Sequence, residues 1–450
     1  MKLEQVHNVY FLGIGGIGMS ALASYFLFSG KKVGGYDRTP NDRTQALQSE
    51  GAQIHFEDDI SKIPADFTQP ENTLVVYTPA LPDSHTELTY YRQNDFHLAK
   101  RSEVLGMIAN PSYCMAVAGT HGKTTTSCIL AHLLNEAQAP YMAFLGGVSE
   151  DLGNNFALNG TDYAVVEADE FDRSFLRLTP DIACITAMDA DHLDIYGAAE
   201  ELTAAFEEFI ALQKPGGKSI IRYGLPIPGI TYGEEAEATY RATNIRLHQG
   251  AYQFDIEAPG LHIKGCRFTK PGRHNLMNAL AAFALGVESG FDPNILAKAL
   301  GTFKGVARRF SYQIKTSDFV YIDDYAHHPT EIDAVHQAVS ELYPDKRNTV
   351  VFQPHLFSRT QDFADDFARS LAQFDHVLLL EIYPARELPI PGVDANWLLN
   401  KIENPNKKLV TKAELVHEVR NINPDILLTL GAGDIGNEVT QLKTALSHGN

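Results

Sequence analysis

"AVAGTHGKTTTS", residues 116–127, joins the end of an apolar run to a glycine-rich turn and then to the start of a helical stretch. Backbone N–H groups of such a turn can surround a phosphate, and the N-terminus of the following helix attracts the same negative charge. A lysine at 123 can reach the outer phosphates, and a threonine at 124 can bind Mg²⁺. Valine stands at 117, where the full P-loop pattern has glycine. The stretch predicts a nucleotide-binding loop made of Gly119, Thr120, His121, Gly122, Lys123, Thr124 and Thr125.

Outward from this loop, short β-branched or aromatic runs alternate with longer stretches of helical period. This alternation is typical of parallel sheets with crossover helices, and 450 residues are enough for about three domains. We predict an α/β fold of three consecutive α/β domains. They are a Rossmann-like N-terminal domain (1–109), a central P-loop ATPase domain (110–308) and a Rossmann-like C-terminal domain (309–450). The polar stretch 109–112 and the helix-breaking stretch 301–313 mark the two boundaries.

A second glycine motif, "GIGGIG" at 13–18, follows a predicted strand and precedes a predicted helix. Its spacing, Gly13-x-Gly15-x-x-Gly18, lets the backbone approach a diphosphate. Asp37 ends the next predicted strand, where an acid can accept a ribose hydroxyl. On its own this motif also fits a nicotinamide-dependent oxidoreductase.

Two acidic stretches follow strands of the central domain. "VVEADEFDRSF" (165–175) contains Glu167 and Glu170, and "DADHLDIY" (189–196) contains His192. A solvated acidic loop is the ordinary reading of such clusters. However, ligands of an open α/β sheet collect at the carboxyl ends of its strands, so these acids are expected to face a metal ion beside the nucleotide.

Polar residues also follow two predicted strands of the C-terminal domain, in "DDYAHHPTEID" (323–333) and "FQPHLFSRTQDF" (352–363). Packing alone does not explain histidine and aspartate at both ends, with an arginine in the second, so we predict one substrate-facing edge. A third polar turn, "KPGRHN" (270–275), precedes an alanine-rich helix, which its residues can simply cap.

Composition limits the partners. A net charge of -19 repels a nucleic-acid backbone, and no apolar run is long enough to cross a membrane, so neither partner is expected. The four cysteines have no paired metal spacing and are expected to be buried free thiols, which favours a cytoplasmic protein. The composition does not indicate an oligomeric state.

Taken in order along essentially the whole chain, the motifs resemble those of the ATP-dependent muramyl ligases of peptidoglycan synthesis. They are "GIGGIGMS", "AGTHGKTTT", "EADEFDRSF", "DADHLDIY", "GRHN", "RRF", "DDYAHHPTE", "FQPHLFSRT", "EIYPARE" and "LGAGDIG". The "DDYAHHPTE" and "FQPH" pair is similar to that of the alanine-adding branch. The resemblance implies a ligase that uses ATP and Mg²⁺ to join L-alanine to the carboxylate of UDP-N-acetylmuramate through an acyl phosphate.

The resemblance also implies roles for single residues. The UDP substrate is expected at Gly13, Gly15, Gly16, Ile17, Gly18, Asp37 and Thr78. ATP is expected at the central loop and at Asn275, Arg309 and Asp324. Mg²⁺ is expected at Thr124, Glu167 and His192. The groups expected at the reaction are Lys123, His327, His328 and Arg359.

The chain departs from the family pattern at three positions. Ala187 stands where asparagine is usual, Asp189 where glutamate is usual, and Leu356 where many alanine-adding members carry arginine. A murein peptide ligase, which joins a tripeptide to UDP-N-acetylmuramate, therefore stays open as a variant. An oxidoreductase would leave the central loop without a purpose, and a non-catalytic nucleotide sensor would not require the histidines and arginine of the C-terminal edge.

Overall fold

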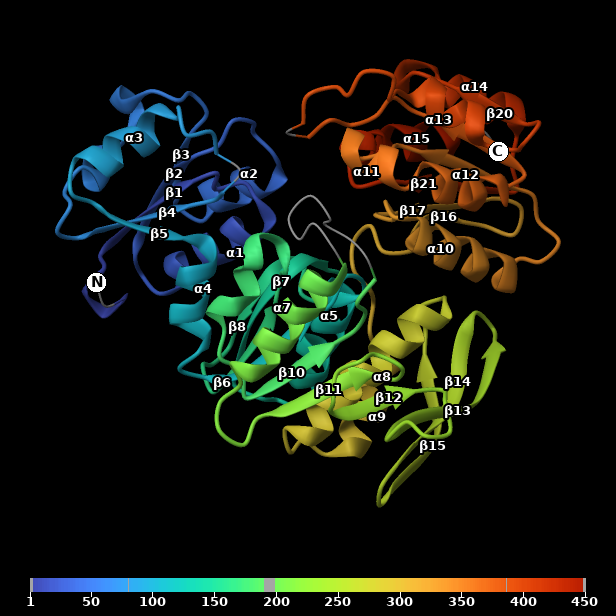
Figure 1. Ribbon diagram of the computed structural model, residues 1–450, viewed down its shortest axis with the longest axis horizontal. Coiled ribbons are helices and arrows are strands. Elements are labelled where there is room, and N and C mark those ends of the chain that lie inside the picture. The colour runs from blue at the N-terminus through green and yellow to red at the C-terminus, as the bar shows by residue number, and fades with distance from the viewer. Residues whose placement is uncertain (1–2, 80, 190–198, 386, 448–450) are drawn as a thin grey trace. The chain divides into compact units, whose positions relative to one another are not determined.

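The computed structural model describes residues 3–79, 81–189, 199–385 and 387–447 (Figure 1). Within these residues the chain forms three sheets in chain order, with five, ten and six strands. Each sheet falls in one of the three predicted α/β domains, and the predicted fold class is confirmed. The exact boundaries at 109/110 and 308/309 stay a prediction.

The first sheet has the strand order β3-β2-β1-β4-β5, and all of its neighbouring strands are parallel. Its central strand, β1 (Asn8–Leu12), is buried from residue 9 onward, as expected for a strand covered on both faces. The other strands are β2 (Lys32–Tyr36), β3 (Gln53–His55), β4 (Thr73–Tyr77) and β5 (His97–Lys100). The helices are η1 (Leu3–Gln5), α1 (Ile17–Phe28), α2 (Asp42–Ser49), η2 (Ile60–Lys62), η3 (Ala65–Phe67), α3 (Thr86–Gln93) and α4 (Arg101–Ala109).

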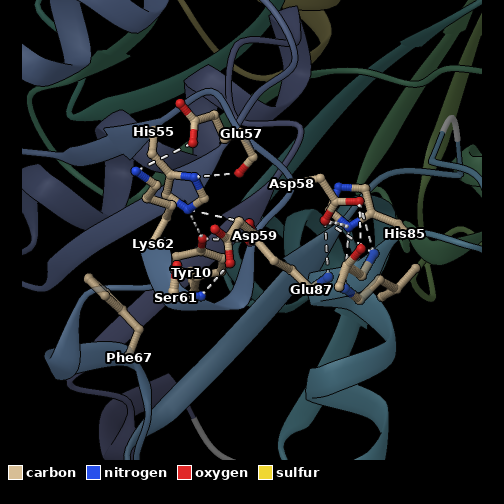
Figure 2. A network of polar contacts seen from close by, with 12 residues as sticks. Tyr10, His55, Glu57, Asp58, Asp59, Ser61, Lys62, Phe67, His85 and Glu87 are labelled. Carbon is tan, nitrogen blue, oxygen red and sulfur yellow. Dashed lines mark hydrogen bonds and ion pairs between the residues drawn. The ribbon is translucent and has the colours of Figure 1, made fainter.

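A polar network lies inside this N-terminal domain (Figure 2). The Tyr10 hydroxyl oxygen is 2.7 Å from Glu87 Oε2 and 2.7 Å from His55 Nε2. Glu87 is fully buried, and this burial raises the pKa of its carboxyl to about 7. Burial also lowers the pKa of His55, so its ring is mostly neutral near neutral pH and offers Glu87 little compensating charge. The network therefore favours a protonated Glu87 in the folded protein.

We predict that this proton makes the stability of the protein depend on pH. An unfolded glutamate has a pKa of about 4.3, so between roughly pH 4.3 and 7 the folded protein holds a proton that the unfolded chain has released. Stability consequently falls as the pH rises through that window. Glu87→Gln keeps the shape without the proton, so its thermal unfolding midpoint should fall less than that of the wild type between pH 5 and 8. Glu57→Gln, at an exposed neighbour, is the control, and equal pH dependence in all three proteins would contradict the prediction.

The second sheet has the order β15-β14-β13-β12-β11-β10-β6-β9-β7-β8. Its parallel core contains β6 (Tyr113–Ala118), β9 (Tyr163–Glu167) and β10 (Ile182–Ile185), and β8 pairs antiparallel with β7 at one edge. The remaining strands are β7 (Tyr141–Ser149), β8 (Asn154–Leu158), β11 (Lys218–Arg222), β12 (Ile230–Gly233), β13 (Tyr240–His248), β14 (Ala251–Ala258) and β15 (Leu261–Phe268). The helices are α5 (Lys123–Glu136), η4 (Phe171–Arg177), α7 (Ala199–Ala211), α8 (Arg273–Glu288) and α9 (Pro293–Leu300).

The third sheet has the order β16-β17-β21-β18-β19-β20 and is parallel except for its edge strand β16. The strands are β16 (Ser311–Lys315), β17 (Val320–Asp324), β18 (Asn348–Phe352), β19 (His376–Leu379), β20 (Lys407–Leu409) and β21 (Ile426–Leu430). The helices are α10 (Pro329–Leu342), α11 (Phe357–Asp362), α12 (Ala364–Ala372), α13 (Ala395–Lys401), η5 (Lys412–Glu414), α14 (Leu415–Ile422), η6 (Asp434–Asn437) and α15 (Glu438–Ser447).

The chain divides into two compact units. The first consists of Met1–Arg246, Gln253–Phe268 and Met277–Lys304, and the second of Leu247–Tyr252, Thr269–Leu276 and Gly305–Asn450. All four cysteines are buried and free, as the sequence predicts. In the part of the chain that the structure describes, the helices are too short or too polar to cross a membrane.

Candidate active site

The predicted nucleotide loop connects β6 to α5, and its two glycines are needed where they stand. Gly119 and Gly122 have φ angles of +129° and +84°, which L side chains rarely adopt. A Cβ atom at 119 would lie 2.3 Å from Thr186 Oγ1, and one at 122 would lie 2.5 Å from Asn278 Oδ1. Any side chain at these positions would therefore disturb the loop and the polar groups packed against it.

Backbone hydrogen bonds attach the loop to the end of β10. The amide of Thr186 donates to the Ala118 carbonyl at 3.0 Å, and the amide of Thr120 donates to the Ala187 carbonyl at 3.0 Å. On the other side of β6, Val117 is in register with Glu167 at the end of β9. The carboxyl ends of β9, β6 and β10 thus meet at the nucleotide loop, which is the arrangement expected for ligand binding in an open α/β sheet.

Glu167 occupies a space that a glycine leaves open. Its Oε2 atom accepts a hydrogen bond from the Gly146 amide at 3.0 Å, and a Cβ atom at 146 would lie 2.3 Å from both carboxylate oxygens. Thr124 is buried in the first turn of α5. Threonine and carboxylate oxygens are suitable Mg²⁺ ligands, so the donor set at this edge fits the predicted ion. Within the described residues no group of three or more histidine, cysteine, aspartate or glutamate side chains is placed to hold a metal, and His192 lies outside them.

Lys123 is held inside the nucleotide loop by two acceptors. Its Nζ atom donates to the Gly119 carbonyl and to Glu170 Oε1, each at 2.7 Å. Burial alone would lower the pKa of Lys123, but the carboxylates of Glu170, Asp169 and Glu167 outweigh it and raise the pKa above its ordinary value. The lysine is therefore a fixed cation at the loop.

The N-terminal glycine loop and the acidic edge of the central sheet line one cavity of about 240 Å³. Gly16, Ile17, Gly18 and Thr78 line it together with Glu167 and Asp169. The cavity thus brings residues predicted for the UDP substrate together with a residue predicted for Mg²⁺. Arg101 also lines it, 3.6 Å from Asp169, and supplies a cation that the sequence analysis did not single out. Its position directly after β5, at the carboxyl end of the sheet, is the signal that points to it.

Asp37 is placed at the glycine loop by hydrogen bonds. Its Oδ2 atom accepts from the Gly15 amide at 2.7 Å, and the Arg43 Nε atom donates to the Gly15 carbonyl at 2.7 Å. Gly13 turns the chain with a φ angle of +89°. Asp37 therefore stabilises the glycine loop itself, in addition to any contact with a ribose.

In the second unit, the carboxyl ends of β17 and β18 flank the end of β21, since Asp324 and Phe352 are both in register with Leu430. The segments that follow them meet, because the rings of His327 and His355 are 6.1 Å apart. The structure therefore brings the two predicted polar stretches to one edge of the sheet. His327 Nδ1 lies 2.9 Å from the Tyr325 carbonyl, which fixes the orientation of its ring.

For other predicted residues of this unit, the structure shows their burial and contacts within the protein. The buried Asp324 accepts hydrogen bonds from the amides of Phe310 and Ala326, and burial raises its pKa to about 6 although Arg309 opposes the rise. His328 is the N-cap of α10 and accepts from the Thr330 amide. Arg359 is buried on α11, while Asn275 donates to the Pro271 carbonyl at 2.6 Å.

Two further residues beside the predicted sites, Asn278 and Arg308, were not predicted from the sequence. Asn278 lies against Gly122 and stands three residues after Asn275 on α8, a spacing that places the two on one helix face. Arg308 donates to Asp323 at 3.0 Å and to the Gly431 carbonyl at 2.7 Å. Arg308 could have been proposed from the sequence, because it is a basic residue directly before the predicted site residue Arg309.

This combination of a nucleotide loop, an acidic strand end and a histidine-bearing C-terminal sheet defines a multidomain nucleotide-dependent enzyme. Family models match three consecutive parts of the chain: "Mur ligase family, catalytic domain" at residues 8–113, "Mur ligase middle domain" at 117–286 and "Mur ligase, glutamate ligase domain" at 308–433. The chain belongs to the Mur ligase family.

Relatives support the same conclusion along the whole length. The chain is 56% identical over 446 residues to a UDP-N-acetylmuramate–L-alanine ligase of Flavobacterium psychrophilum, with 99% of each chain covered. Its structure is similar to the UDP-N-acetylmuramate–alanine ligase of Thermotoga maritima (TM-score 0.83, 28% identity, 98% of this chain and 100% of the other). It shares the fold of a murein peptide ligase of Psychrobacter arcticus (TM-score 0.71, 23% identity, 98% and 99% covered).

Proposed function

We propose that the chain is an ATP-dependent ligase that joins L-alanine to the carboxylate of UDP-N-acetylmuramate. The observation that carries this proposal is the 56% identity, along 99% of both chains, to a ligase named for that reaction. The glycine loop and its fixed lysine provide the phosphate-binding group that such a reaction needs. The murein peptide ligase is not favoured, since that neighbour is only 23% identical.

The expected chemistry explains the need for ATP. A carboxylate is a poor acylating group, so it first takes the γ-phosphoryl group of ATP and becomes an acyl phosphate. The amine of L-alanine then attacks the acyl carbon, and phosphate leaves. The phosphoryl step mainly requires positioning and neutralisation of charge, which Lys123 supplies from the nucleotide loop.

The metal assignment belongs to the same proposal. We expect Thr124 and Glu167 to hold Mg²⁺, and His192 is a third candidate from the sequence. The ion, when bound, supplies positive charge for the phosphates. On the substrate side, we assign the diphosphate of UDP-N-acetylmuramate to the N-terminal glycine loop and Thr78, with Arg101 as an added cation in the same cavity.

The acceptor side is assigned to the C-terminal edge. His327 is the better candidate to assist the amine, because His328 caps α10 and its ring packs 4.8 Å from that of Phe363. Arg359 is expected to bind a substrate carboxylate. The roles of Asn275, Arg309 and Asp324 toward ATP, and a cytoplasmic location, stay predictions from the sequence.

Phosphate release tests this function directly. We expect release only when ATP, Mg²⁺, UDP-N-acetylmuramate and L-alanine are all present, because the acyl phosphate otherwise has no acceptor. Each component is omitted in turn, and a tripeptide replaces L-alanine in a parallel series. Release at full rate without an amino acid would contradict the ligase, and faster turnover with the tripeptide would favour the peptide ligase.

A further inference from the structure

We propose that Glu170 is a positioning residue, which holds the Lys123 ammonium at the phosphate end of the nucleotide loop. The proposal rests on the proposed function, since it assumes that Lys123 serves ATP. Glu170 belongs to the acidic stretch after β9, whose acids were expected to face a metal ion, but the structure pairs Glu170 with Lys123.

Burial separates Glu170 from the other acids of its stretch. Its side chain is fully buried, whereas those of Asp169 and Asp172 are 39% and 37% exposed. A buried carboxylate is costly unless a cation is paired with it. Lys123, with a side chain only 13% exposed, provides that cation at 2.7 Å. Glu170 is therefore part of the nucleotide loop's structure and is not one of the solvated acids.

The backbone around Glu170 is fixed by its neighbours. The Arg173 amide donates to the Glu170 carbonyl at 3.0 Å, and the Phe175 amide donates to the Asp169 carbonyl at 2.9 Å. Asp172 and Arg173, two and three residues after Glu170, have φ angles of +54° and +52°, which non-glycine residues seldom adopt. Lys100 pairs with Asp172 at 3.0 Å, but both side chains are partly exposed, so this pair adds little to the stability of the turn. Such a conformation persists only where the surrounding structure imposes it, and it is often found at functional sites.

The geometry at the ammonium explains what the pair does. A lysine ammonium has three N–H bonds, and Lys123 directs two of them at Gly119 and Glu170. With two directions fixed, the third is also fixed, and we assign it to a phosphate oxygen. A cation placed in advance stabilises charge that develops during phosphoryl transfer more effectively than one that must move into place.

Glu170→Gln tests this role, because it keeps the size of the side chain and removes its charge. We expect kcat to fall roughly tenfold, while the KM for ATP and the Kd for ATP measured by calorimetry change less than threefold. Asp172→Asn, in the same turn, is the matched control and should retain wild-type kcat.

A double-mutant cycle separates positioning from a general structural effect. If Glu170 acts through Lys123, then Glu170→Gln should have little effect on turnover in a Lys123→Ala background. The same tenfold loss in that background, or a wild-type kcat in Glu170→Gln alone, would overturn the proposal. If Glu170→Gln does not fold, Glu170→Asp replaces it. This variant withdraws the carboxylate by one methylene, and its turnover is measured alone and in the Lys123→Ala background with the same criteria. A wild-type protein without alanine-dependent phosphate release would instead refute the proposed function.

Discussion

Lys123→Ala is expected to lower turnover by a factor on the order of a thousand, because it removes a cation from the point where charge develops during phosphoryl transfer. The side chain leaves the first turn of α5 and is held 2.7 Å from both Gly119 and Glu170, so its loss is not easily replaced by another group. We would measure kcat from alanine-dependent phosphate release, per folded molecule.

Lys123→Ala can lower activity through a loss of stability as well as through a loss of catalysis, so the two effects must be measured separately. Lys123→Ala leaves Glu170 buried without its cation, and breaking a buried pair typically costs about 3–5 kcal/mol. The double variant Lys123→Ala/Glu170→Gln removes both charges and should recover stability without recovering turnover. Lys100→Ala removes a lysine that pairs with an acid of the same stretch and should have little effect on kcat. Near-normal turnover in a folded Lys123→Ala protein would mean that ATP binds elsewhere.

The sequence was sufficient to predict the parts of the fold that depend on local pattern. Strand β6 is an apolar run that ends at a glycine, and the two loop glycines have positions where a Cβ atom would collide with neighbours. Such positions can be recognised in the sequence, because only glycine fits them. The antiparallel edge strands β8 and β16 were not predicted, since the orientation of an edge strand depends on which strand it meets.

The site was less predictable, because burial decides the role of each acid. Glu170 and Asp172 stand two residues apart in one acidic stretch, yet only Glu170 is fully buried. A left-handed turn at Asp172 and Arg173 follows Glu170, and no residue type in the stretch requires that conformation. Arg101 is a similar case, since its cavity is completed by Glu167 and Asp169 from a later part of the chain. The position of Arg101 directly after β5 can be read from the sequence, but the later contacts that complete its cavity leave no pattern near it.

Arg359→Lys is expected to weaken the apparent affinity for UDP-N-acetylmuramate or L-alanine by roughly tenfold or more, the loss of about 1.4 kcal/mol. The guanidinium group can bind a carboxylate through two parallel hydrogen bonds, which a lysine ammonium cannot reproduce. We expect Arg359 to carry more of this interaction here, because leucine stands at 356, where the resemblance to alanine-adding ligases implies arginine.

The structure places Arg359 on a short helix whose first turn is anchored by a side chain. It is buried on α11, and Glu387 accepts a hydrogen bond from the Ser358 amide at 3.0 Å in the first turn of that helix. Steady-state constants for all three substrates should therefore show a loss confined to UDP-N-acetylmuramate or L-alanine, with the KM for ATP almost unchanged. Arg369→Lys, at an exposed position on α12, is the control. A loss confined to ATP would assign Arg359 to the phosphates, because a carboxylate contact has no reason to change nucleotide affinity.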